Sequence, residues 1–419
     1  MIAARTPAWW RTTLALCLGS FLVFINLYAP QPLLPALREA YGVSTLAISL
    51  MMSAATLSLA ASLLVFGPLS DAIGRGAIMR LTLLASGLLS LALALAPSFE
   101  VLLALRALQG FVLGGLPAVA IAWMGDEFER PALLLAVGLY IGANSLGGIG
   151  GRVIGGAVAE VGGAAASFMT VGAVTLVGLA LFWRLLPPPR GFTPRRFAWR
   201  AALADLGGHL ATPRLFGAYL LGGLNFMIFI NQYSYLTFRL AEAPFGLGAT
   251  SIGLIFLTYL GGTLGSSLSG RLAARWAQPA CMMLGIGLLA VGTALTLAGS
   301  LAWIIAGLSL NAFGFFLAHS MASSWVGRHA RRARGSASAL YLVFYYGGAS
   351  LGGLWLEPFW QSAGWLGVAL GSWLVLGGTL ALAVWMWRGE RREAQGAALA
   401  LASSPQTSSS RSTRPQADL

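Results

Sequence analysis

Lysine is absent from this sequence, and charge of either sign is scarce. Charged residues make up 9% of the 419 residues, and all 26 basic residues are arginine. Soluble domains contain about 25% charged residues, and a single soluble core stops growing near about 250–300 residues. Since hydrophobic residues make up 57% of the chain and its mean hydropathy is +0.77, the composition excludes a soluble enzyme. It predicts a polytopic membrane protein.

Cysteines and catalytic or phosphate-binding motifs are also rare or missing. Cys17 and Cys281 are the only cysteines, and each lies in an apolar run, which argues against a disulfide framework or a metal site. The sequence contains no His-Glu-x-x-His pair, no supported Ser-His dyad and no Gly-x-x-x-x-Gly-Lys-Ser/Thr loop. We therefore expect no cofactor, no enzymatic activity and no ATP-driven transport. The net charge of +13 comes from arginines between apolar runs and does not indicate nucleic acid.

Apolar runs long enough to cross a bilayer occur twelve times. About 20 apolar residues span the hydrocarbon core, and open irregular backbone cannot face lipid, so each run should be a helix. The runs lie near residues 12–36, 44–66, 77–96, 99–123, 132–157, 165–186, 214–238, 248–269, 279–299, 301–326, 336–358 and 364–387. The predicted fold is an all-α membrane protein with twelve transmembrane helices.

Arginines are distributed unequally between the connections of these runs. If the N-terminus is cytoplasmic, only Arg38 and Arg239 lie on the outer side, and only Arg106 and Arg152 lie away from the inner ends of the runs. The remaining arginines then lie in the inner connections and the two tails. Because positive residues favour the cytoplasmic side, this asymmetry predicts a multi-pass protein of the bacterial inner membrane with both termini inside.

The connection at 187–212 is rich in proline and arginine and separates six runs from six. The Ser-Leu-Gly-Gly of residues 145–148 recurs at 350–353, as expected for two parallel repeats. We expect an N-terminal six-helix bundle at 1–186, a cytoplasmic interdomain loop at 187–212, a C-terminal six-helix bundle at 213–388 and a disordered cytoplasmic tail at 389–419.

Glycines at positions 147, 151 and 155 form a small-residue stripe along one face of the fifth run. Small residues spaced by four allow helix backbones to approach closely in a membrane. The stripe predicts helix packing and does not indicate a ligand.

Several motifs resemble those of one transporter family. Residues 67–76 read Gly-Pro-Leu-Ser-Asp-Ala-Ile-Gly-Arg-Gly between the second and third runs, and residues 106–110 read Arg-Ala-Leu-Gln-Gly. Both segments resemble motifs of the major facilitator superfamily. Together with residues 31–35, 138–152 and 319–325, they resemble the YnfM-like bacterial inner-membrane transporters. The resemblance implies two six-helix bundles, secondary transport by alternating access, and a central cavity lined by the first, fourth, seventh and tenth helices.

The loop motif implies a conformational latch. In the family, its aspartate lies near the N-terminus of the eleventh helix, where the helix dipole favours a carboxylate. Its arginine pairs with an acidic residue at the inner end of the fourth helix. The corresponding residues here are Asp71, Arg75, Gly67, Gly74, Asp126 and Glu127. The alternative is an ordinary topogenic loop.

Three polar residues inside the runs are candidates for the transport pathway. Arg106 should face a cavity or a partner, because charge inside a bilayer is costly; the alternative is snorkelling to the outer surface. Arg152 shares a helix face with Asn144 and Gly148, and it either lines the cavity or reaches the lipid headgroups. His319 either carries protons or makes a packing hydrogen bond.

A further polar and aromatic set falls largely where the resemblance places the cavity. Each member could instead hold helices together. The set includes Asn26, Tyr28, Gln109, Asn225, Asn231, Asn311 and Tyr345. As a group, these side chains favour a neutral or weakly charged, partly aromatic substrate.

The function predicted is export of a small organic compound, drug-like or sugar-like, with protons as the coupling ion. We expect the protein to act as a monomer in the lipid bilayer. Proton-coupled uptake or facilitated diffusion is the alternative, because no proline lies between Pro131 and Pro187, where antiporters of the family carry one. A non-transporting sensor would need a soluble output domain, and the short polar tail does not provide one.

Overall fold

The computed structural model describes residues 1–189, 199–330 and 332–403, and these residues are almost entirely helical. A single isolated bridge pairs Ile2 with Phe128. The elements are α1 (Pro7–Tyr28), η1 (Gln31–Leu33), α2 (Leu34–Tyr41), α3 (Thr45–Ile73), α4 (Arg75–Leu93), α5 (Phe99–Leu113), α6 (Gly115–Glu127), α7 (Arg130–Leu185), α8 (Trp199–Leu210), α9 (Pro213–Ala241), α10 (Ala249–Ile255), η2 (Phe256–Thr258), α11 (Tyr259–Ala273), α12 (Gln278–Leu295), α13 (Leu301–His329) and α14 (Arg334–Ser403).

Ten stretches of the described chain are long and apolar enough to cross a membrane. Two of them are far longer than one crossing needs, since α7 has 56 residues and α14 has 70, whereas about 20 suffice. Each bends at a glycine with a positive φ, 75° at Gly163 and 54° at Gly364, a conformation that glycine adopts without steric cost. Each can therefore supply two crossings. The all-α membrane fold is confirmed, and the two bends are consistent with twelve crossings.

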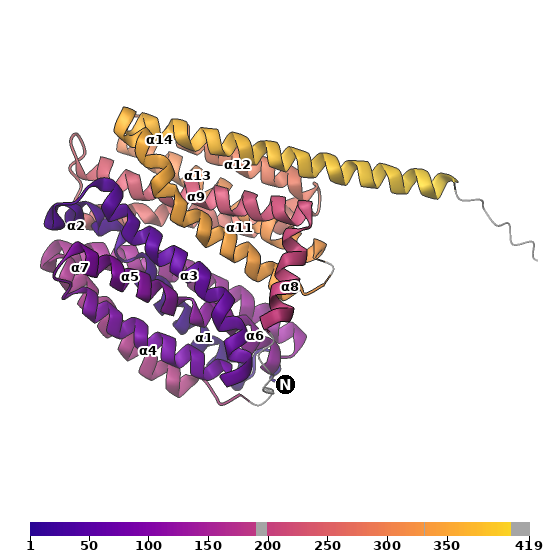
Figure 1. Ribbon diagram of the computed structural model, residues 1–419, viewed down its shortest axis with the longest axis horizontal. Coiled ribbons are helices and arrows are strands. Elements are labelled where there is room, and N and C mark those ends of the chain that lie inside the picture. The colour runs from indigo at the N-terminus through magenta and orange to yellow at the C-terminus, as the bar shows by residue number, and fades with distance from the viewer. Residues whose placement is uncertain (190–198, 331, 404–419) are drawn as a thin grey trace, which may run out of the picture.

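The helices form two halves joined by α8 (Figure 1). In the first half, α7 packs against α1 and α4, and α3 packs against α5. In the second half, α14 packs against α9, and α13 packs against α11 and α12. Contacts of α3 with α14 and of α7 with α10 join the halves. This arrangement places α1, α7, α9 and α14 where a site between the halves can form.

The predicted glycine stripe is a packing surface for α1. A Cβ added at Gly151 would lie 2.8 Å from the Cα of Ile25, and one at Gly155 would lie 2.5 Å from the carbonyl oxygen of Ala29. Any side chain at these positions would push the two helices apart. The stripe thus sets the distance between α1 and α7.

Gly151→Leu should destabilise the first half, because overpacking a closely packed contact costs about 1–3 kcal/mol. Gly142→Leu is the matched control: Gly142 lies on the same helix, and a Cβ there meets nothing within 4 Å. Thermal unfolding of the detergent-solubilised protein should show a lower midpoint for Gly151→Leu alone. Equal midpoints for the two variants would contradict this account of the stripe.

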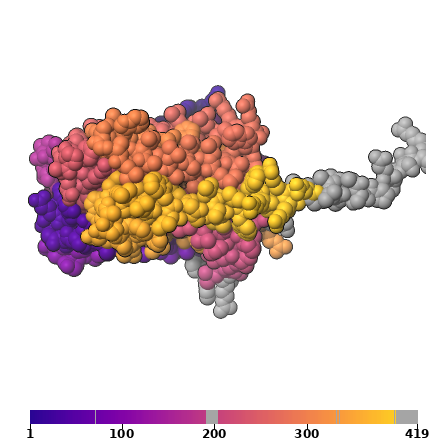
Figure 2. Space-filling view, turned by 90° about the horizontal axis from the view of Figure 1, so that it is seen from above, coloured from indigo at the N-terminus to yellow at the C-terminus, as the bar shows by residue number. Residues whose placement is uncertain are grey.

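The end of the chain differs from the expectation of a disordered tail beginning at residue 389. Helix α14 continues to Ser403 and projects beyond the bundle (Figure 2). Residues 389–403 are rich in Ala, Glu, Arg and Leu, which are strong helix formers. Glu393 also pairs with Arg214 of α9 at 2.5 Å. The remaining tail, 404–419, and part of the predicted interdomain loop, 190–198, lie outside the described residues.

Candidate functional site

Polar side chains join the two halves at the end of the bundle where α2 lies (Figure 1). Arg38 of α2 pairs with Glu242 after α9 at 3.1 Å. The backbone amide of Thr250, in the first turn of α10, donates to the carboxylate of Glu160 at 2.7 Å. Since Glu160 belongs to α7 and Thr250 to the second half, this bond holds the halves together directly. We call this end of the molecule the closed end.

Glu160→Gln should weaken the closed end, because a hydrogen bond to a carboxylate is about twice as strong as one to a neutral amide. Spin labels at Leu95 and Gly299, which lie in connections of the two different halves and are exposed, would report the separation of the halves. The labels require a background in which Cys17 and Cys281 are replaced by alanine.

The expected result is a larger population at long distance in Glu160→Gln. The control is Glu100→Gln, which changes an exposed glutamate in the first turn of α5. The interpretation fails if both variants leave the distance distribution unchanged.

Arg106 of α5 is fully buried, and its guanidinium donates to the last turn of α1. Nη1 lies 3.1 Å from the carbonyl oxygen of Asn26, and Nη2 lies 3.0 Å from that of Leu27. Within a helix, the Asn26 carbonyl would accept from the N–H of residue 30, but Pro30 has none. The guanidinium thus replaces the helix donor that proline removes.

A hydrogen-bond network surrounds this guanidinium. Gln109 accepts from Arg106 at 2.5 Å and donates to Ser90 at 2.7 Å. The Asn26 side chain accepts from Ser90 at 2.5 Å and donates to Thr175 at 2.7 Å. The network joins α1, α4, α5 and α7 within the first half. The geometry therefore favours a structural role for Arg106, Gln109 and Asn26 in this conformation.

Arg106→Met should destabilise the protein, because each buried carbonyl left unsatisfied costs about 1–3 kcal/mol. Pro30→Ala in the Arg106→Met background should recover part of this loss, since an N–H at position 30 can bond the Asn26 carbonyl. Thermal unfolding of the four proteins of this double-mutant cycle measures the coupling. A Pro30→Ala effect that is equal in both backgrounds would show that the guanidinium does not replace the missing N–H.

Arg152 is fully buried between the halves and does not reach the lipid headgroups. Its guanidinium carbon lies 4.0 Å from the ring centroid of Tyr28, 4.5 Å from that of Phe256 and 4.7 Å from that of Tyr259. Its Nε donates to Gln31 at 2.7 Å. Among the described residues no carboxylate pairs with it, so the ring faces provide the electrostatic stabilisation. Sequence reasoning missed Phe256 and Tyr259, which come from the second half.

An aromatic cluster fills the second half beside Arg152. Phe226 of α9 stacks on Tyr345 of α14 with ring centroids 3.7 Å apart. The ring of His319, on α13, lies 4.7 Å from that of Tyr345, and its Nδ1 lies 3.0 Å from the Tyr341 hydroxyl. Two predicted residues, His319 and Tyr345, are thus brought together, whereas Tyr28 lies against Arg152.

The four remaining predicted asparagines divide into packing residues and one unpartnered residue. Asn231 donates to a backbone carbonyl of α14 at 2.8 Å, and Asn311 donates to a glutamine of α9 at 2.9 Å. Asn144 accepts a hydrogen bond from Ser20 of α1. Asn225 is buried, and neither its nitrogen nor its oxygen has a partner among the described residues. A buried amide without partners suggests a place for a ligand or water.

The predicted latch loop is a tight turn between α3 and α4. Gly74 links the helices with φ 99° and ψ 132°, a conformation that L-residues rarely adopt. Gly67 lies inside α3, where an added Cβ would meet nothing within 4 Å. The side chain of Asp71 lies outside the described part of the structure, so its expected position near the eleventh crossing stays a prediction.

Arg75, the first residue of α4, forms an ion pair with Asp126 near the end of α6. Both side chains are partly buried, at 14% and 29% exposure, so the pair is better shielded from solvent than a surface ion pair. Glu127, the other acidic residue at this position, is buried. The ion pair ties the latch loop to the fourth crossing within the first half.

Two helical halves that meet around buried polar and aromatic side chains in a membrane-spanning chain are an arrangement typical of a membrane transporter. The comparisons identify the family. A family model described as Major Facilitator Superfamily matches residues 16–353, and the chain belongs to this superfamily. It is therefore a multi-pass membrane transporter of small molecules and not an enzyme.

Curated relatives agree with this assignment. The chain is 38% identical to the uncharacterized MFS-type transporter YybF of Bacillus subtilis (strain 168), covering 88% of this chain and 91% of the relative. It is 35% identical to the inner membrane transport protein YnfM of Escherichia coli (strain K12), covering 91% of each.

The solved structures include a bacterial homologue of the human lysosomal transporter Spinster, in an inward-facing and unoccupied conformation. It aligns with a TM-score of 0.69 at 17% identity, covering 91% of this chain and 96% of that one. This likeness shows the same fold.

Proposed function

We propose that this protein exports a small organic compound across the bacterial inner membrane in exchange for protons, as a monomer. The observation that carries the proposal is the polar closure between the halves at the α2 end, where Glu160 meets Thr250 and Arg38 meets Glu242. The arginine asymmetry supports cytoplasmic termini. The closed end is then the periplasmic end, and the compound would be loaded from the cytoplasm.

The substrate class follows from the side chains around the aromatic cluster. The stacked rings of Phe226 and Tyr345 suit a flat apolar group, which prefers offset or edge contacts with aromatic faces. The unpartnered amide of Asn225 offers both a donor and an acceptor. Arg152 is already surrounded by rings and Gln31. These features favour a neutral or weakly charged aromatic compound that carries a hydrogen-bonding group.

His319 is the residue to which we assign proton coupling. A histidine can take up and release a proton, and this one is hydrogen-bonded to Tyr341 beside the proposed substrate rings. Proton entry is downhill under a normal membrane potential and can drive export. The ion pair of Arg75 with Asp126 would act as the latch that holds the first half rigid while the halves move.

Proteoliposomes containing an internal pH-sensitive dye test this proposal. We expect neutral and weakly basic aromatic compounds to produce a substrate-dependent pH change in the direction that corresponds to exchange. His319→Gln should abolish the pH change, whereas His329→Gln, at the end of α13, should retain it. Asp71→Asn should slow turnover without loss of the protein.

The outcomes separate the parts of the proposal. Substrate movement without any pH change would overturn proton coupling. A normal pH change in His319→Gln would remove that residue from the coupling path. A response to sugars alone would overturn the aromatic substrate class.

Proton-coupled uptake is the second candidate, and one observation favours it. The fifth crossing carries no proline between Pro131 and Pro187, although the resemblance leads one to expect a proline there in antiporters. In the same proteoliposomes, uptake would move substrate and protons in the same direction, so the sign of the pH change distinguishes it from export.

A further inference from the structure

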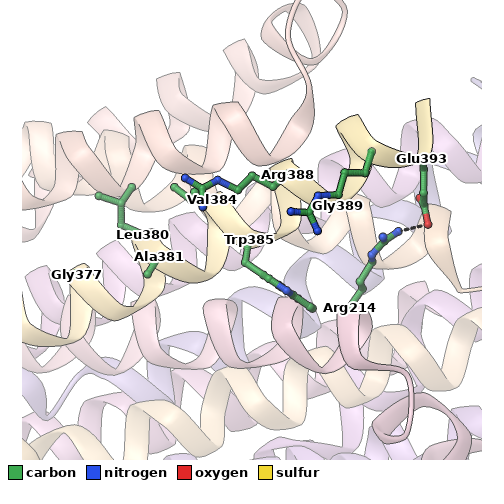
Figure 3. A pocket seen from close by; sticks show the side chains of 10 residues that line it. Arg214, Gly377, Leu380, Ala381, Val384, Trp385, Arg388, Gly389 and Glu393 are labelled. Atoms are coloured by element: carbon green, nitrogen blue, oxygen red, sulfur yellow. Dashed lines mark ion pairs between the residues drawn. The ribbon is translucent and has the colours of Figure 1, made fainter. Parts of the chain in front are cut away.

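A groove of about 770 Å³ runs along α14 (Figure 3), and no residue of the aromatic cluster lines it. One end of the groove is apolar and includes Gly377, Ala381 and Trp385. The other end is basic and includes Arg214, Arg388 and Arg392. Neither end belongs to the transport site described above.

Helix geometry explains the groove. Residues 377, 381 and 385 follow one another at intervals of four and therefore share a helix face, and Figure 3 shows the side chains of Ala381 and Trp385 on that face. Gly377 is exposed, and an added Cβ there would meet nothing within 4 Å. The small residues leave a depression that the larger Trp385 closes at one side.

The length of the groove matches one leaflet of a bilayer. From Gly377 to Arg388 the helix rises about 16 Å at 1.5 Å per residue, and half of the hydrocarbon core is about 15 Å. Trp385 lies close to the basic end, where tryptophan is favoured at the boundary between hydrocarbon and headgroups. The groove thus runs from the depth of the bilayer centre to its surface.

The basic end carries uncompensated positive charge. Arg214 pairs with Glu393 at 2.5 Å, and its approach depends on Gly389, whose added Cβ would lie 3.0 Å from Nη2 of Arg214. Arg388 and Arg392 are exposed, and neither forms an ion pair with a described residue. A compact anion can therefore be held by two guanidinium groups four residues apart on one helix.

We infer that this groove binds one anionic phospholipid. Arg388 and Arg392 hold the headgroup phosphate, since guanidinium groups bind phosphate oxygens in a bidentate manner. An acyl chain lies along Gly377 and Ala381. Charge complementarity and the leaflet-length apolar face together select an anionic lipid over a zwitterionic lipid, whose own cation would face the two arginines.

Thermal unfolding of the delipidated, detergent-solubilised full-length protein tests the inference. Phosphatidylglycerol should raise the unfolding midpoint by about 2–4 °C more than phosphatidylethanolamine with the same acyl chains. The double variant R388Q/R392Q should lose this difference. R271Q/R275Q should keep it, because these arginines have the same spacing at the end of α11 and are also exposed.

A second pair of variants tests the acyl part of the site. Gly377→Phe should fill the groove and remove the phosphatidylglycerol effect. Gly378→Phe should not, since Gly378 is equally exposed and unobstructed but does not line the groove. This pair leaves the arginines intact, so it remains informative if R388Q/R392Q folds poorly.

Three results would overturn the inference. Equal midpoints with the two lipids would show that the arginines do not select the headgroup. An equal shift with inorganic phosphate alone would show a soluble-anion site. An unchanged lipid effect in both R388Q/R392Q and Gly377→Phe would place the lipid elsewhere.

Discussion

The structure depends on the satisfaction of two backbone carbonyls where α1 ends inside the bundle. A bilayer core contains no water that could donate a hydrogen bond to these carbonyls, and Pro30 has no N–H to donate to the carbonyl of Asn26. The Arg106 guanidinium provides it, at 3.1 Å. This stabilised break is followed by η1, which carries Gln31, and Gln31 bonds both Arg152 and Ser234 of the second half. The buried charge of Arg106 therefore stabilises the break in the chain that places Gln31 between the two halves.

The second half solves the corresponding problem without charge. Helix α9 runs unbroken from Pro213 to Ala241, so none of its interior carbonyls needs a hydrogen-bond donor from a side chain. A neutral set of Gln232, Thr293 and Asn311 joins α9, α12 and α13 through bonds of 2.9–3.1 Å. The two halves thus differ in composition. Among the described residues, both buried arginines lie in the first half, and most of the aromatic cluster lies in the second. A substrate between them would meet rings mainly on one side.

The sequence predicted the features that depend on local spacing. Apolar runs predicted the membrane helices, and glycines at intervals of four predicted a close-packing face on α7, although not that its partner is α1. The sequence identified Arg106 and Arg152 as candidate residues of the transport pathway, but it did not identify the residues that contact them. The signal for Arg106 was available, since Pro30 stands four residues after Asn26. The ring partners of Arg152 come from a distant part of the chain, and no local pattern indicates them. The helical extension of α14 was missed because the whole segment from residue 389 was assigned from the polar composition of its end, although residues 389–403 are rich in helix formers.

The proposed transport by alternating access requires that the halves separate without leaving a buried charge unpaired, and the surroundings of Arg152 allow this. Separation would remove Phe256 and Tyr259, which belong to the second half. The first half would still supply the Gly148 carbonyl at 2.8 Å, Gln31 at 2.7 Å and the ring of Tyr28. The ion pair at the closed end is 31% and 55% exposed, and such pairs contribute about 0–1 kcal/mol. This ion pair can therefore form and break at a low cost during a transport cycle.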